Sequence, residues 1–282
     1  MLKAQLIMKK WFKLCLIIVF IIYLVICASI YFLQNQMLFP AYAARAVPQD
    51  WAPNLGQNDT QAMITGQCGK LHVVKWALPS DKGTIMIFHG NGESIASVQE
   101  QVPMFQKLGY SVMAWDYPGY GKSSNCWFNE DDLLRDSESA YQWLIKQTSV
   151  KQAPESDVIL YGRSVGTGLA LYIASQHQVK QVLLVSPYDA LVSVAKDHMP
   201  FFIPVGLISH LPIHASQWLE HVKCKVRAIH GLNDTLISPV HAVALFKDVK
   251  ANASIEWVAG AGHNDITSFE EYDRWLAKQL AD

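Results

Sequence analysis

Short, unbroken apolar runs recur between residues 71 and 258 and alternate with stretches that have the apolar spacing of helices. Apolar runs of this length without polar alternation are typical of parallel strands that are covered on both faces. Strands that alternate with helices are typical of βαβ units. The sequence therefore predicts an α/β fold, with a mostly parallel sheet and helices on both faces. The expected strands are residues 71–77, 84–88, 110–115, 158–161, 182–185, 226–229 and 254–258.

Three of the expected helices have recognisable ends. Asn129 precedes three acidic residues, which favour the positive end of a helix dipole, so a helix is expected to start there. Residues 165–176 form a second expected helix. Ser268 and Glu271 have the spacing of a capping box, which predicts the start of a C-terminal helix.

Residues 14–33 contain no charge and only one serine. As a helix, these 20 residues would be about 30 Å long, which is the thickness of the hydrocarbon core of a bilayer. The segment is longer than the apolar region of a signal peptide, and every face is apolar. We expect an uncleaved transmembrane anchor rather than a buried core helix or a cleaved signal peptide. The alternative of a cleaved signal has some support, because Cys27-Ala28-Ser29 offers small residues for a weak cleavage site.

The charges beside this segment predict its orientation. Basic residues precede it closely, whereas the first basic residue after it is Arg45. The positive-inside rule places the N-terminus in the cytoplasm and the rest of the chain on the opposite side, periplasmic or lumenal. We expect a basic tail at residues 1–13, a connector broken by proline and glycine at 34–60, and a folded domain at 61–282. The lysines of the tail are Lys3, Lys9, Lys10 and Lys13.

Composition excludes other classes of protein. The 23 Lys and Arg residues are balanced by 24 Asp and Glu residues, which argues against a nucleic-acid binder. The cysteines outside the apolar segment have neither zinc-site nor disulfide-framework spacing, although one disulfide is possible outside the cytoplasm. His210 and His214 are separated by Pro212 without an accompanying glutamate, so we expect no metal site and no cofactor. The cysteines concerned are Cys68, Cys126 and Cys224, of which the spacing selects no pair.

Residues 162–166 match the G-x-S-x-G pattern around Ser164. The match follows an apolar run and opens an expected helix, which is the context of a nucleophile elbow. Gly162 and Gly166 would let neighbouring segments approach a strained turn without clashing. An ordinary glycine-rich turn between strand and helix is the alternative interpretation.

A serine hydroxyl needs a base, and the base needs a carboxylate that orients it. His263 lies after the last expected strand, and Asp234 lies after the strand before it. Both would share the edge of the sheet with Ser164, in the Ser…Asp…His order of α/β-hydrolases. Asp189, after an earlier strand, is the rival carboxylate, although it has the position of a helix cap. His89 precedes a Gly-Asn-Gly turn and is expected to be structural.

Acyl transfer also needs hydrogen-bond donors for the developing oxyanion. One expected donor is the backbone N–H of Val165, directly after the nucleophile. The other should come from the turn after the strand at residues 84–88, where we expect the backbone N–H of Asn91.

Together, these motifs resemble the membrane-anchored α/β-hydrolases of the serine aminopeptidase-like group, which includes the anchored ABHD proteins. The resemblance covers roughly residues 38–280 and implies the α/β-hydrolase fold with a Ser-His-Asp triad. It does not specify the substrate, because the group includes esterases, peptidases, lipases and protein depalmitoylases. The matching pieces, besides the apolar segment, are Phe39-Pro40, residues 89–92, 116–123, 162–166 and 230–234, and Gly262-His263.

We expect a membrane-anchored serine hydrolase that cleaves a carboxylic ester or thioester through an acyl-enzyme at Ser164. The alternatives are a serine peptidase and a non-catalytic scaffold that binds a partner at the membrane. The turn His89-Gly90-Asn91-Gly92 lacks the second glycine and proline of the proline-iminopeptidase branch, which argues against the peptidase. Residues 187–223 are a long apolar excursion between two strands, either an irregular crossover helix or a cap over the site. An apolar cap would favour a lipid-like acyl group.

Overall fold

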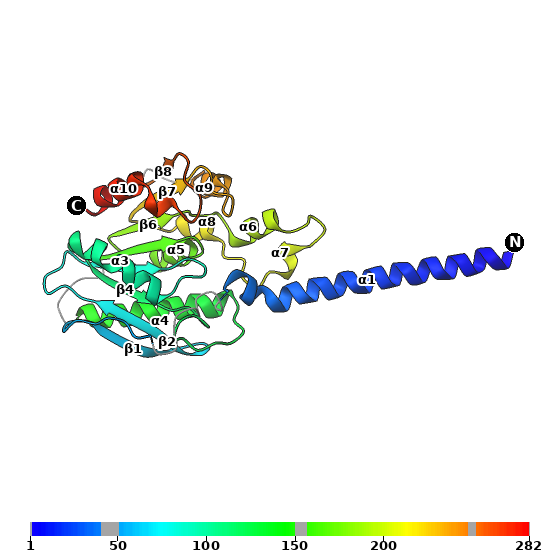
Figure 1. Cartoon of the computed structure of the whole chain (residues 1–282), viewed down its shortest axis with the longest axis horizontal. Coiled ribbons are helices and arrows are strands. Elements are labelled where there is room, and N and C mark those ends of the chain that lie inside the picture. Colours follow the sequence, from blue (N-terminus) through cyan, green and yellow to red (C-terminus); the bar gives the residue numbers. More distant parts are fainter. Residues whose placement is uncertain (1, 41–50, 150–156, 248–251, 282) are drawn as a thin grey trace.

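A single eight-stranded sheet forms the centre of the computed structural model, which describes residues 2–40, 51–149, 157–247 and 252–281 (Figure 1). The strand order is β1-β2-β4-β3-β5-β6-β7-β8. β2 pairs antiparallel with both β1 and β4, and the pairs from β4 through β8 are parallel. This is the α/β-hydrolase fold expected from the sequence. The strands are β1 (Thr60–Gly66), β2 (Gly69–Trp76), β3 (Thr84–Phe88), β4 (Ser111–Trp115), β5 (Val158–Arg163), β6 (Gln181–Val185), β7 (Lys225–Gly231) and β8 (Ala253–Val258).

The seven expected strands are present, and β1 is an additional one. β1 is an edge strand whose residues are exposed or half-buried, in register with β2 from Thr60 opposite Lys75 to Gly66 opposite Gly69. The central strands β3, β4 and β6 are buried along their whole length. Burial on both faces gives a strand an unbroken apolar sequence, which an edge strand does not need.

Helices cover both faces of the sheet (Figure 1). The apolar sides of α4 and α5 pack on one face, and those of α3 and α10 pack on the other. Alternate residues of β3 point into the two cores: Met86 and Phe88 into the first, and Ile85 and Ile87 into the second. The longer helices of the folded domain are α3 (Ile95–Lys107), α4 (Glu130–Ser149), α5 (Gly166–Gln176), α9 (Pro239–Phe246) and α10 (Glu270–Leu280).

Of the two expected helix caps, the one at Asn129 is confirmed and the one at Ser268 is wrong. Asn129 Oδ1 accepts a hydrogen bond from the backbone N–H of Asp132 (3.0 Å), so Asn129 caps α4. Ser268 does not cap α10, because its hydroxyl donates to the carbonyl of Asp265 (2.6 Å) and the helix is preceded by Phe269. A short 3-10 turn, Ile266–Ser268, takes up the residues where the capping box was expected.

Residues 187–223 contain three short helices rather than one crossover helix. α8 (Ala215–Leu219) contributes Ala215 and Leu219 to the core on the α5 side of the sheet. α6 (Leu191–His198) and α7 (Val205–Ile208) instead project from the domain toward the N-terminal helix (Figure 1).

The N-terminal helix α1 (Leu2–Leu38) extends away from the domain (Figure 1). Its residues Ile7–Leu38 are long and apolar enough to span a bilayer. The helix continues through the first residues of the expected connector at 34–60, because its last turns pack against the domain: Phe39 is buried, and Asn35 Nδ2 donates to the carbonyl of Phe128 (2.8 Å). Arg45 and Pro48 lie outside the described residues.

A disulfide joins Cys68, in the turn between β1 and β2, to Cys126, in the loop before α4, with their Cα atoms 5.5 Å apart. Cys224 is a free, half-buried thiol. The pairing that the spacing left open is thus decided by the fold, which brings the two loops together.

Candidate active site

Ser164 lies in the tight turn between β5 and α5, with a backbone φ of 53°. A positive φ is strained for a residue with a side chain and is found where the surrounding structure enforces it. The backbone N–H of Ser164 donates to the carbonyl of Val185 (2.9 Å), and its carbonyl accepts the Thr167 hydroxyl (2.7 Å). The turn therefore has the geometry of a nucleophile elbow.

The two glycines of the motif are required by close packing. A Cβ at Gly166 would clash with the carbonyl oxygen of Phe88 on β3. A Cβ at Gly162 would lie 2.8 Å from the carbonyl oxygen of Gly166. Neither side chain could be accommodated without moving backbone, so the motif is dictated by the approach of β3 and α5.

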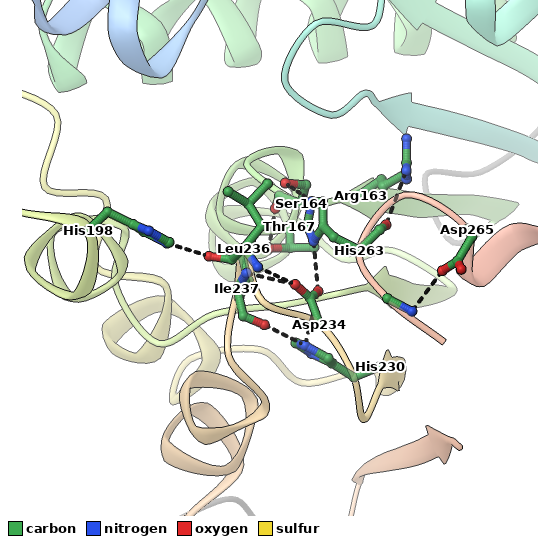
Figure 2. A network of polar contacts seen from close by, with 11 residues as sticks. Arg163, Ser164, Thr167, His198, His230, Asp234, Leu236, Ile237, His263 and Asp265 are labelled. Atoms are coloured by element: carbon green, nitrogen blue, oxygen red, sulfur yellow. Dashed lines mark hydrogen bonds and ion pairs between the residues drawn. The ribbon is translucent and has the colours of Figure 1, made fainter. Parts of the chain in front are cut away.

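The structure brings Ser164, His263 and Asp234 together (Figure 2). His263 Nε2 is 2.9 Å from Ser164 Oγ, and His263 Nδ1 is 2.7 Å from Asp234 Oδ2. Nδ1–H donates to the carboxylate in the tautomer that leaves Nε2 free to accept the serine proton. All three side chains are nearly buried.

Asp234 is held as a carboxylate. Burial by itself would raise the pKa of Asp234, but hydrogen bonds from His230, His263 and the backbone N–H of Ile237 outweigh it and lower that pKa below its ordinary value. Asp234 Oδ1 also accepts from the backbone N–H of Leu236 (2.9 Å). The charge is thus fixed beside the imidazole at neutral pH.

The rival carboxylate, Asp189, lies elsewhere. Its Oδ1 is 2.8 Å from Nδ1 of His241, whose Nε2 is 2.9 Å from Asp197. The expectation that Asp189 caps a helix is wrong, because α6 starts after Ala190 without a side-chain cap. Through its contact with His241, Asp189 instead connects the loop after β6 to α9.

The other histidines considered in the sequence have structural contacts. His89 is buried and stacks on Tyr117 with ring centroids 3.9 Å apart, and burial lowers its pKa. His210 Nε2 contacts Asn35 Oδ1 (3.1 Å). Among the described residues, no group of three His, Cys, Asp or Glu side chains is arranged to hold a metal ion.

The turn after β3 lies against the nucleophile. A Cβ at Gly90 would be 3.6 Å from the Cβ of Ser164. The N–H of Gly90 is already used, since it donates to Glu93 Oε2 (2.6 Å). Asn91 follows directly, and its side-chain Oδ1 accepts from the Tyr120 hydroxyl (3.4 Å). Val165, the other expected donor, precedes the first residue of α5.

Two charged residues that the sequence analysis did not select connect the parts of the site. Arg163 Nη1 forms an ion pair with Glu93, and its Nη2 donates to the carbonyl of His263 (3.4 Å). Glu93 in turn holds the N–H of Gly90. The sequence offered one signal for this role: Arg163 is a charged residue at the end of an otherwise uncharged strand, directly before Ser164.

The chain is similar in sequence to several known proteins. Residues 79–207 match the family described as serine aminopeptidase, S33. The human alpha/beta hydrolase domain-containing protein 17B is 30% identical over 195 residues, which cover 69% of this chain and 65% of that protein. The mouse protein 17C is also 30% identical, over 69% of this chain and 58% of its own length. The chain thus aligns with less than two thirds of each of these relatives.

Solved structures show the same fold. An esterase from Pyrococcus furiosus superposes with a TM-score of 0.66 and 24% identity, covering 82% of this chain and 95% of that one. An alpha-beta serine hydrolase homologue from Coxiella burnetii superposes with a TM-score of 0.58 and 17% identity, over 81% and 98% of the two chains. At these identities the likeness concerns the fold alone.

Proposed function

Because this chain is an α/β-hydrolase of the serine aminopeptidase S33 family, related to the alpha/beta hydrolase domain-containing 17 proteins, we propose that it is a membrane-anchored serine hydrolase that cleaves a carboxylic ester or thioester. The observation that carries the proposal is the continuous pair of hydrogen bonds from Asp234 through His263 to Ser164. A scaffold without catalysis would not need a strained serine backbone aligned with a buried base and carboxylate.

In the first step, His263 Nε2 accepts the Ser164 proton while Ser164 Oγ attacks the carbonyl carbon of the substrate. The imidazolium then passes this proton to the leaving alcohol or thiol, and the acyl group stays on Ser164. Water, deprotonated by the same nitrogen, attacks the acyl carbon. The bond from that carbon to Ser164 Oγ breaks, the imidazolium returns the proton to Oγ, and the carboxylic acid leaves. Asp234 orients the imidazole and stabilises its charge in both steps.

The backbone N–H groups of Asn91 and Val165 are the proposed oxyanion donors. The position of Gly90 against Ser164 supports the first, because it places the turn of Asn91 beside the nucleophile. The start of α5 directly after Val165 supports the second, since the first N–H groups of a helix lack partners within the helix.

The helix α1 is proposed to anchor the catalytic domain to a membrane, with the N-terminus in the cytoplasm. The lysines before the apolar segment support this orientation. The Cys68–Cys126 disulfide supports it independently, because disulfides persist in oxidising compartments and are rare in the cytosol.

The direct test is covalent labelling of the full chain with a fluorophosphonate, followed by turnover of a p-nitrophenyl ester series, a thioester and an aminoacyl amide. We expect labelling at Ser164 and turnover of the esters or the thioester. Turnover of the amide alone would support the peptidase instead. An unlabelled protein without turnover would support a non-catalytic scaffold.

A further inference from the structure

Residues 199–208, here called the cap tip, form an uncharged apolar protrusion that follows α6 and includes α7. Phe201 is 99% exposed, Leu207 is 87% exposed and Phe202 is 54% exposed. The last Lys or Asp side chains before the tip are Lys196 and Asp197, and His198 lies between them and the tip. A cluster of exposed aromatic and aliphatic side chains is costly in water and marks a surface that meets another apolar phase.

The cap tip is fixed to one side of α1. Ile203 and Val205 belong to a small buried apolar cluster with residues of α6, and Tyr23, Cys27 and Ile30 of α1 pack against that cluster. The Tyr23 hydroxyl donates to the carbonyl of Phe202 (3.0 Å). The contacting positions of α1 recur every three or four residues, so they form one helical face. The tip therefore cannot move independently of the anchor.

This contact sets the depth of the tip. Tyr23 lies ten residues before the end of the apolar segment 14–33, a distance of about 15 Å along a helix axis. Beyond that segment, Gln34 Nε2 donates to the carbonyl of Ile208 (2.6 Å) and its Oε1 accepts the N–H of His210 (3.0 Å). The tip thus runs beside the part of α1 that lies inside the apolar segment.

We propose that the cap tip is a second membrane element, which inserts Phe201, Phe202 and Leu207 among lipid acyl chains beside the anchor. The inference rests on the anchor proposed above. Its occupant is the bilayer rather than a protein, because the tip packs against the apolar helix that is proposed to span it. Figure 1 shows α7 beside that helix. Apolar side chains placed this way add a second attachment point and hold the domain at one orientation.

The tip is also connected to the active-site loop that carries Asp234. His198, the last residue of α6, donates from Nε2 to the carbonyl of Leu236 (2.8 Å), whose N–H donates to Asp234 (Figure 2). Leu236 and Leu232, on either side of Asp234, are about half exposed. α6 thus connects the tip to the loop of the proposed catalytic carboxylate, where these two leucines are exposed. Together with a tip inside the bilayer, they favour an ester or thioester with a long acyl chain that resides in the bilayer.

The depth of the tip can be measured without catalysis. The full chain carrying Cys15→Ser, Cys27→Ala and Cys224→Ser receives one new cysteine, either Phe201→Cys or the control Arg274→Cys on the distant helix α10. Each is labelled with a polarity-sensitive fluorophore in phosphatidylcholine vesicles. We expect the probe at 201 to be quenched by brominated lipid and several-fold less by iodide than the probe at 274. Equal iodide quenching at both positions, in protein that floats with the vesicles, would overturn the inference.

Catalysis provides the second measurement. Phe201→Asp/Leu207→Asp should reduce turnover of a long-chain ester carried in vesicles by about tenfold, because aspartate is excluded from the hydrocarbon core. Turnover of the soluble p-nitrophenyl butyrate should stay within about twofold of wild type, as for the control Met63→Asp on the exposed edge strand. Unchanged turnover of both esters would overturn the inference. If the unmutated chain hydrolysed neither ester, the proposed activity would be contradicted instead. The fluorescence measurement would then still test whether the cap tip lies in the bilayer.

Discussion

Arg163 Nη2 donates a hydrogen bond to the carbonyl of His263 (3.4 Å), so the residue before the nucleophile also holds the loop of the proposed base. The same guanidinium forms an ion pair with Glu93, which holds the turn of the proposed oxyanion donor. One planar, always charged group thus connects three loops that are far apart in the sequence.

This connection predicts that Arg163→Lys lowers kcat by about 10- to 100-fold with little change in KM, because a point charge cannot contact both partners and small misplacements of reacting groups are costly. Steady-state kinetics on a soluble ester measure the effect. Glu93→Gln should have a smaller effect, and the double variant should be less impaired than the sum of the two, since both residues act through one contact. Additive losses would argue for independent roles.

Ser164→Ala should abolish fluorophosphonate labelling and turnover, because only the attacking hydroxyl is lost. Ser186 provides a matched control. It is also buried, follows the next strand of the sheet and has a φ of 52°. Ser186→Ala should therefore keep both labelling and activity. Labelling of the Ser164→Ala protein at a wild-type rate would disprove the proposed nucleophile.

Asp234→Asn should lower turnover by about 10⁴-fold, because an amide stabilises the wrong tautomer of the imidazole and cannot stabilise its charge. Asp189→Asn should change turnover by less than about threefold, since its contact is with His241 rather than His263. Circular dichroism of each variant checks that both rates are compared for folded protein. A large loss in Asp189→Asn with normal turnover in Asp234→Asn would reverse the assignment.

The Cys68–Cys126 disulfide should stabilise the domain. It joins residues 58 positions apart, for which the chain-entropy relation gives about 4 kcal/mol of unfolding free energy. Cys68→Ser/Cys126→Ser should therefore unfold at a lower denaturant concentration, whereas Cys224→Ser should change stability much less.

The compartment of the domain can be tested with the same cysteines. In membranes from an expressing cell, a thiol-reactive polymer should label Cys68 and Cys126 in the denatured chain only after reduction. Labelling without reductant would place the domain in a reducing compartment.

Asp136 should make stability depend on pH. Burial raises the pKa of Asp136 to about 6, and its Oδ1 accepts only the N–H of Gln67 (2.7 Å) among the contacts of the described residues. A pKa raised in the folded state means that the folded chain binds the proton more tightly. The contribution to stability is therefore fully present below the ordinary pKa of about 4 and is lost as the pH rises through 6.

Asp136→Asn should remove this loss and stabilise the protein at pH 7 by up to about 3 kcal/mol. Solvent screening of the carboxylate makes the gain in stability smaller than this upper value. Thermal unfolding at pH 4.5 and pH 7 measures the difference. An Asp136→Asn protein that is less stable than wild type at pH 7 would contradict the expected sign.

The sequence by itself determined the fold class and the three residues of the proposed triad. Strands such as β3 and β6 are covered on both faces, so burial imposes an unbroken apolar run that can be read directly. The carboxyl ends of parallel strands share one edge of the sheet, so side chains that follow β5, β7 and β8 had to meet. The local signals were weaker for β1 and for the start of α10, because an exposed edge strand and a 3-10 turn need no distinctive pattern.

Only the tertiary structure decided which distant groups contact one another. It paired Cys68 with Cys126, gave Asp189 to His241, and connected Arg163 to Glu93 and His263. It also laid the cap tip along α1, although Tyr23 and Phe202 are 179 positions apart. Such contacts depend on how loops and helices pack around the sheet. That packing is set by many small apolar and polar contacts together, and no single segment carries it.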